Sequence, residues 1–186
     1  MIVEKIALNE VVIIEPHAYE DNRGYFMETY QEARYRDLGI SSRFVQDNLS
    51  FSRKGALRGL HYQYPHAQDK LVQVIRGEIF DVAVDIRRGS PTFGQWASAL
   101  LSDKNHRQLY VPAGFAHGFL VLSETAYVLY KCTDYYSPGS EGGILWSDPD
   151  LAIQWPTQDP LVSPKDTVHP RLQQISQDRL PSFNNR

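Results

Sequence analysis

The sequence predicts an all-β domain of the sandwich, jelly-roll or barrel type. Short apolar segments are separated by turn residues along most of the chain, and 11 Tyr and 8 Phe supply the aromatic side chains that strands favour. Only one segment has the character of a helix. Many antiparallel strands with little helix are typical of these three architectures.

The clearest strand covers residues 79–86. Phe80, Val82, Val84 and Ile86 fall on one face, and Asp81 and Asp85 fall on the other, which is the period of two that a strand requires. Residues 70–75 form the preceding strand. Residues 76–78 contain a glycine and are expected to be the turn that joins the two.

The other elements follow from the same reasoning. The helix is expected at residues 31–38, because Gly39 provides a stop. In chain order, the remaining strands are expected at residues 11–14, 25–30, 44–50, 95–101, 108–111, 118–121 and 126–133.

The chain is expected to form a single domain over residues 1–186, with a proline-rich tail from about residue 156. The prolines favour an extended path. The tail keeps apolar side chains, so we expect it to pack over the barrel. These side chains are Leu161, Val162, Val168 and Leu172.

Composition excludes several classes of function. The apolar fraction of 42% is ordinary for a globular protein, and a net charge of −3 offers no basic surface for nucleic acid. No apolar run is long enough for a membrane span, and the first residues lack the pattern of a signal peptide. Cys132 is the single cysteine, so no disulfide can form within the chain and a cytoplasmic location is expected.

The segment GLHYQ, residues 59–63, contains the first candidate for chemistry. His61 could be a packing residue that is hydrogen-bonded inside a strand. However, Arg58 precedes it by three residues and Lys70 follows it at the start of the next strand. A histidine near two cations is a plausible base beside a bound anion.

The segment VPAGFAHGF, residues 111–119, places His117 at the head of an apolar strand. It could be a plain hairpin turn, but with the strand pattern it resembles the second signature of the cupin barrels. Cupin metal sites usually contain a His-x-His pair, and here that stretch reads His61-Tyr62-Gln63 with no acid before Asp69. Two histidines rarely satisfy a transition metal, so no metal is expected.

Two later segments contain candidates for proton transfer. In YKCTDYYSPGSEGGILW, residues 130–146, Tyr130 is either a packing residue or a phenol aimed into the barrel. Packing is the preferred interpretation for Tyr135. In SPKDTVHP, residues 163–170, Asp166 either lies on the surface or reaches back to fix the tautomer of a histidine.

The segments DNRGYFMETY, residues 21–30, and FVQDNLS, residues 44–50, contain the last candidates. Arg23 and Glu28 flank a turn and an aromatic strand. The consecutive Gln46, Asp47 and Asn48 lie between apolar residues, so they need partners from the backbone or from a ligand.

Taken in order, these segments, together with KLVQVIRGEIFDVAVDIRRGSPTFGQW, resemble the dTDP-4-dehydrorhamnose 3,5-epimerase family from about residue 10 to about residue 167. The resemblance implies a cupin-like jelly-roll β-barrel with short peripheral helices. It also implies a homodimer without metal or cofactor, and a dTDP-4-keto-6-deoxyglucose substrate that is inverted at C3 and C5.

The resemblance also assigns residues. His61 would be the base, oriented by Asp166, Lys70 would stabilise the enolate oxygen, and Tyr130 would deliver a proton from the opposite face. Arg23 and Glu28 would reach the partner's ligand. The other expected substrate-binding residues are Gln46, Asp47, Asn48, Arg58, His117, Tyr136, Glu141 and Lys165.

Three alternatives remain open at this point. The same four catalytic groups could serve an epimerase that inverts only C3 or only C5. A metal-dependent cupin enzyme would need ligands beyond the two histidines, which Gln63 offers only weakly. A nucleotide-sugar binding module would not need His61, Asp166, Lys70 and Tyr130 together.

Overall fold

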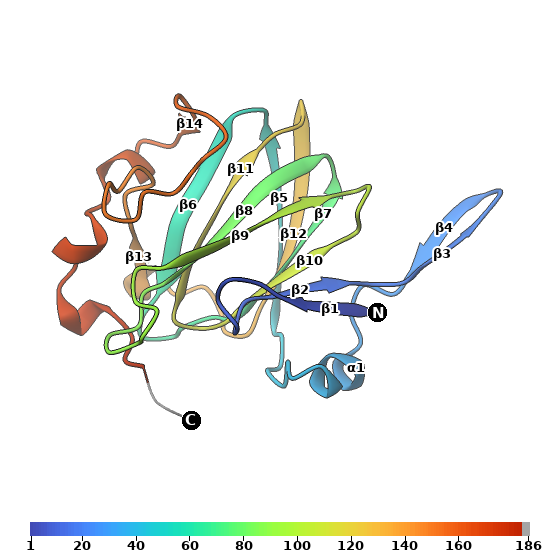
Figure 1. Ribbon diagram of the computed structural model, residues 1–186, viewed down its shortest axis with the longest axis horizontal. Coiled ribbons are helices and arrows are strands. Elements are labelled where there is room, and N and C mark those ends of the chain that lie inside the picture. The colour runs from blue at the N-terminus through green and yellow to red at the C-terminus, as the bar shows by residue number, and fades with distance from the viewer. Residues whose placement is uncertain (184–186) are drawn as a thin grey trace.

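A computed structural model describes residues 1–183 and confirms the all-β prediction. Two sheets of mainly antiparallel strands face each other and enclose the core (Figure 1). The first sheet has the order β1 (Ile2–Lys5), β2 (Val12–Glu15), β10 (Gln108–Val111), β7 (Lys70–Arg76), β12 (Thr125–Cys132), β5 (Gln46–Arg53). The second has the order β13 (Glu141–Gly143), β6 (Ala56–Gln63), β11 (Phe115–Val121), β8 (Glu78–Asp85), β9 (Trp96–Ser102).

The remaining elements lie at the periphery. Strand β14 (Leu161–Val162) pairs in parallel with β6, and β3 (Ala18–Asp21) and β4 (Gly24–Met27) form a hairpin that projects away from the sheets (Figure 1). The helix expected at residues 31–38 is α1 (Glu32–Asp37), whose first turn is capped by the side chain of Gln31. Four short 3₁₀ turns follow: η1 (Pro138–Ser140), η2 (Asp166–Val168), η3 (Leu172–Gln174) and η4 (Gln177–Arg179).

The expected turn at residues 76–78 exists, but the strands that it joins do not pair with each other. Strand β7 pairs with β10 and β12, whereas β8 pairs with β11 and β9 in the other sheet. Gly77 makes the connection with φ +93, and a Cβ there would lie 2.2 Å from the carbonyl oxygen of Thr125. The chain therefore changes sheets at a position where only glycine fits.

Strand β8 is buried on both faces, which explains why its sequence is so apolar. Ile79 and Ala83 pack in the core between the two sheets. Val82, Val84 and Ile86 pack in a second cluster on the outside of the sheet.

The C-terminal segment covers that outer face. Leu172 and Leu180 are buried in the same cluster as the outward residues of β8. Leu161 and Val168, which we expected to pack, are exposed instead. Leu172 is buried as expected, and the tail therefore docks through Leu172 and the later Leu180.

Within residues 1–183, no helix is both long enough and apolar enough to cross a bilayer.

The backbones of β6 and β11 approach each other closely at two glycines. A Cβ at Gly59, which has φ +116, would lie 2.6 Å from Cα of Gly118, and a Cβ at Gly118 would lie 2.8 Å from the carbonyl oxygen of Arg58. The register between the strands shifts at this place, next to the directly opposed pair His61 and His117. The glycine contact therefore sets how these two histidines lie relative to each other.

We expect Gly118→Ala to destabilise the protein by about 1–3 kcal/mol, because the added methyl group overlaps backbone that cannot move freely. A lower midpoint of urea unfolding would show it. Gly139→Ala is the control, since a Cβ there meets nothing within 4 Å. It should change the stability by less than about 0.5 kcal/mol. Equal midpoints for the two variants would contradict this account of the strand contact.

Candidate active site

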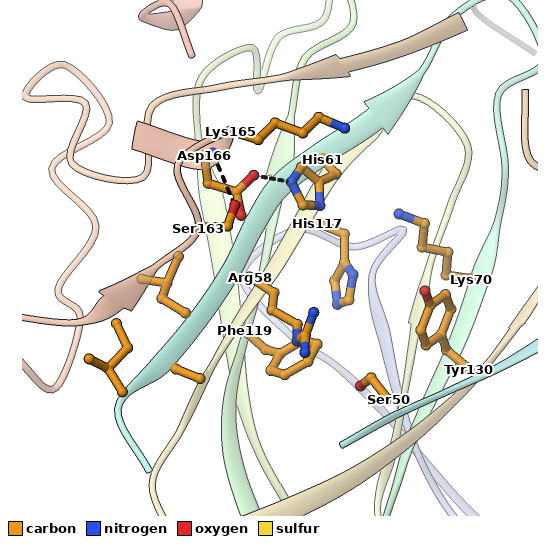
Figure 2. A pocket seen from close by; sticks show the side chains of 13 residues that line it. Ser50, Arg58, His61, Lys70, His117, Phe119, Tyr130, Ser163, Lys165 and Asp166 are labelled. Atoms are coloured by element: carbon orange, nitrogen blue, oxygen red, sulfur yellow. Dashed lines mark hydrogen bonds and ion pairs between the residues drawn. The ribbon is translucent and has the colours of Figure 1, made fainter. Parts of the chain in front are cut away.

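A cavity of about 430 Å³ lies between the two sheets. Strands β6 and β11 supply Arg58, His61 and His117 from one wall, and β7 and β12 supply Lys70 and Tyr130 from the other. The tail closes one side near Asp166. Figure 2 shows these side chains pointing toward a common space from opposite walls. The structure therefore brings the four expected catalytic residues together.

His61 and Asp166 form a hydrogen-bonded pair. Nε2 of His61 lies 2.6 Å from Oδ1 of Asp166, and the other ring nitrogen, Nδ1, points toward the cavity (Figure 2). Burial raises the pKa of the Asp166 carboxyl, but hydrogen bonds, above all the one from His61, outweigh it and hold that pKa below its usual value. Asp166 is thus an anion, and an anion at Nε2 favours the tautomer whose free lone pair is on Nδ1.

Lys70 and Tyr130 face this imidazole from the other sheet (Figure 2). Burial lowers the pKa of the Lys70 ammonium, although the nearby Cys132, Asp81 and Glu141 oppose the shift. Burial also raises the pKa of the Tyr130 phenol. Tyr130 therefore keeps its proton at neutral pH and can act as a donor.

A second histidine–carboxylate pair lies beside the first. Nε2 of His117 is 2.7 Å from Oδ1 of Asp81, and both residues are buried. Within residues 1–183, Oδ2 of Asp81 has no hydrogen-bond partner. Sequence reasoning missed Asp81 as a site residue, although an aspartate in the middle of a buried strand is an informative signal.

A second hollow of about 280 Å³ continues the cavity past His61, Lys70 and Tyr130. Gln46 and Asn48 of β5 lie on its wall, and Nε2 of Gln46 donates to Oδ1 of Asn48 at 3.0 Å. These amides leave further donors and acceptors for a polar ligand.

A cluster of Tyr136, Glu141 and Lys165 lies at the rim. Oε2 of Glu141 lies 2.9 Å from the Tyr136 hydroxyl and 2.6 Å from Nζ of Lys165. Burial raises the pKa of the Glu141 carboxyl, but its hydrogen bonds to Lys165 and Tyr136 outweigh burial and hold that pKa below its usual value. On the main cavity wall, Arg58 donates to Oγ of Ser52 and to the carbonyl oxygen of Phe51.

Four expected binding residues do not line these hollows, and the first is Glu141, which contacts Tyr136 and Lys165 at the rim. Asp47 sits between two cavity-facing residues, so its side chain points to the other face of β5, where it pairs with Lys131 at 3.0 Å. Arg23 pairs with Asp21 in the projecting hairpin, and Glu28 pairs with Arg34 beside it. Within one chain, the structure does not bring Asp47, Arg23 or Glu28 to the cavity.

His169 is a neighbour of the dyad that the sequence analysis did not single out. Its Nε2 lies 3.3 Å from the same Asp166 oxygen that bonds His61, and the two imidazole rings lie edge to face, with centroids 5.8 Å apart. Burial, followed by the charge on His61, lowers the pKa of His169. In the sequence, the only signal for His169 is its position three residues after Asp166, because the tail has no strand or helix periodicity.

Gln63 does not act as the missing cupin ligand. Its amide nitrogen donates to the carbonyl oxygens of His66 and Tyr135, and its amide oxygen accepts from the backbone of Ser137. Gln63 therefore holds a loop in place.

Comparisons with known proteins identify the family of the chain. The profile of the dTDP-4-dehydrorhamnose 3,5-epimerase family matches residues 5–174. A dTDP-4-dehydrorhamnose 3,5-epimerase of Salmonella typhimurium is 54% identical over 177 residues, which are 94% of this chain and 97% of that protein.

Two solved structures share the fold. The dTDP-6-deoxy-D-glucose-3,5-epimerase of Legionella pneumophila, in complex with dTDP-4-keto-L-rhamnose, has a TM-score of 0.96 and 54% identity, covering 98% of each chain. A 3′-monoepimerase of Streptomyces bikiniensis, in complex with dTDP-quinovose, has a TM-score of 0.88 and 34% identity, covering 95% of this chain and 91% of that one. With a matching profile over most of its length and relatives at this level of identity, the chain belongs to the dTDP-4-dehydrorhamnose 3,5-epimerase family.

Proposed function

We propose that the chain is a dTDP-4-dehydrorhamnose 3,5-epimerase, an isomerase that inverts C3 and C5 of a dTDP-4-keto-6-deoxy sugar. The observation that carries the proposal is the placement of a histidine–aspartate pair and a protonated phenol on opposite walls of one cavity, with an ammonium group beside the phenol. Inversion at carbon needs a base on one face of the sugar and an acid on the other.

His61 is the base in this proposal. Asp166 accepts from Nε2–H, so the lone pair of Nδ1 faces the sugar and can take a proton from a carbon next to the ketone. The imidazolium that forms is stabilised by the Asp166 carboxylate. The proton is acidic only because the negative charge moves onto the ketone oxygen.

Lys70 stabilises that oxygen. Its ammonium points into the same cavity, where little water screens it, so its charge acts strongly on a developing enolate. Tyr130 then gives its proton to the carbon from the opposite face, and this reprotonation inverts the centre. His117, held by Asp81, lies close enough to contact the sugar or its phosphates.

The nucleotide half of the substrate occupies the second hollow and its rim. Gln46, Asn48 and Tyr136 offer amide and phenol groups there. Arg58 and Lys165 supply positive charge for the diphosphate, which the guanidinium fork of arginine suits well.

A homodimer would complete the site. The β3–β4 hairpin projects from the barrel (Figure 1), and its Phe26 is 71% exposed. The outer face of β5 and β12 exposes Leu49, Phe51 and Tyr127 as well. Apolar surface of this kind marks an interface, and the hairpin would deliver Arg23 and Glu28 to the partner's substrate.

The dimer proposal predicts twice the chain mass of 21.3 kDa in sedimentation equilibrium. Arg23→Ala should leave that mass unchanged but weaken dTDP binding, because the guanidinium would be missing from the partner's site. A monomer that epimerises the substrate at full rate would contradict the proposal.

We place the enzyme in the cytoplasm, which suits a chain whose only cysteine is free. Its recovery from another compartment after cell fractionation would refute this placement.

Deuterium labelling tests the reaction itself. In deuterated water, the protein should introduce label at both C3 and C5 of the 4-keto nucleotide sugar. His61→Asn should slow labelling at both positions by about a hundredfold to ten-thousandfold, the usual contribution of a proton-transfer group. It should leave dTDP affinity nearly unchanged.

His66→Asn is the matched control, because His66 also pairs with an aspartate, Asp134, but lies at the surface outside the cavity. Label at C3 alone would instead indicate a monoepimerase, the activity named for the Streptomyces bikiniensis structure. Normal labelling by His61→Asn would exclude this histidine as the base.

Tyr130→Phe separates the two proton transfers. The variant keeps the ring but lacks the hydroxyl, so product formation should fall by about a hundredfold or more while exchange of the substrate protons with solvent falls much less. NMR can follow both rates in one sample. Equal losses in the two rates would argue against Tyr130 as the donor.

A further inference from the structure

We infer that His61, Asp166 and His169 form an inhibitory binding site for Zn²⁺ or a similar borderline transition-metal ion. The three residues offer two imidazole nitrogens and one carboxylate oxygen, and these ligand atoms all lie within 4.8 Å of one another. Imidazole and carboxylate donors suit Zn²⁺, whereas Mg²⁺ and Ca²⁺ prefer oxygen ligands alone.

The distances are close to those of a metal site. Zinc bonds of about 2.0–2.1 Å in a tetrahedron place neighbouring ligand atoms about 3.3 Å apart. Nε2 of His169 already lies 3.3 Å from Oδ1 of Asp166. Nε2 of His61 lies 2.6 Å from the same oxygen and would have to move away by about 0.7 Å, which a tilt of the ring allows.

The Nε2 atom of His169 is available to bind a metal ion. Within residues 1–183, its buried Nε2 has no hydrogen-bond partner of good geometry, although Asp166 lies beside it. Gly143 makes room for the ring, since a Cβ at that position would lie 2.3 Å from this same nitrogen. Gly143 is also the residue of β13 that pairs with His61. The backbone therefore holds the second imidazole next to the first.

The metal would block catalysis through the tautomer of His61; this part of the inference rests on the proposed role of that residue. A metal ion at Nε2 takes the lone pair there, so the proton of the neutral ring moves to Nδ1. Nδ1 is the atom that faces the cavity, and with a proton on it His61 cannot act as a base. No proton is gained or lost by the protein in this exchange.

The geometry also predicts how the inhibition behaves. Asp166 lies on the side of His61 that is turned away from Lys70 and Tyr130 (Figure 2). The ion would therefore bind behind the imidazole and leave the sugar and nucleotide hollows open. Zinc should lower kcat and leave the affinity for dTDP unchanged.

Calorimetry with ZnCl₂ and no nucleotide tests the site directly. The wild-type protein should bind about one Zn²⁺ per chain, and MgCl₂ should give no binding. His169→Gln should weaken Zn²⁺ binding by about tenfold or more, since loss of even an outer partner of a metal ligand has effects of this size. Co²⁺ in place of Zn²⁺ should give the visible absorption of a tetrahedral site, and the variant should lack it.

Two further variants test whether Zn²⁺ binding depends on the position of His169 and not on any histidine near an aspartate. Gly143→Ala keeps His169 but pushes its ring away, so it should weaken Zn²⁺ binding as well. His66→Gln removes a surface histidine that also pairs with an aspartate, and it should bind Zn²⁺ as the wild type does. Thermal unfolding shows whether each variant is folded.

Unchanged Zn²⁺ affinity in folded His169→Gln would overturn the inference, and so would competition between Zn²⁺ and dTDP in the wild type. Because calorimetry needs no turnover, the metal site can be confirmed or refuted independently of the proposed epimerase activity.

Discussion

The hydrogen bond between His61 and Asp166 connects the barrel to the tail, and the candidate site depends on it. It joins residues 105 positions apart in the sequence at a distance of 2.6 Å. Strand β6 fixes the imidazole, whereas the carboxylate is held by a short 3₁₀ turn whose backbone is bonded to Ser163. The tail keeps this position because Leu172 and Leu180 are buried against the outside of β8. Burial of apolar surface far from the cavity thus supports the geometry of the proposed base.

The two sheets contribute different chemical groups to the cavity. One carries both histidines, each paired with an aspartate, and the other carries the ammonium and the phenol. The barrel interior also changes the chemistry of these groups, since burial makes the Lys70 ammonium easier to deprotonate and the Tyr130 phenol harder to deprotonate. A fold with facing sheets can place such groups on two sides of a ligand without a conformational change.

Sequence reasoning predicted the fold class, most strands and the four proposed catalytic residues, because period-two patterns and ordered motifs are local signals. It failed where the outcome depends on distant contacts. The segments 70–75 and 79–86 are strands, but nothing local shows that Gly77 sends them into different sheets. Successive side chains of β5 point to opposite faces, and this alternation should have shown that Asp47 faces away from Gln46 and Asn48. Asp81 and His169 were missed because their importance comes from neighbours that only the folded chain supplies.

The late position of Asp166 has a consequence for the synthesis of the protein. Every strand of the two main sheets except the short β14 is complete by Gly143, yet the partner of His61 belongs to a segment more than twenty residues further on. A nascent chain still attached to the ribosome therefore holds the imidazole, the ammonium and the phenol before it holds the group that sets the tautomer. The two sheets can therefore form before the segment that carries Asp166 has been synthesised, and the bond to His61 is made only when that segment docks.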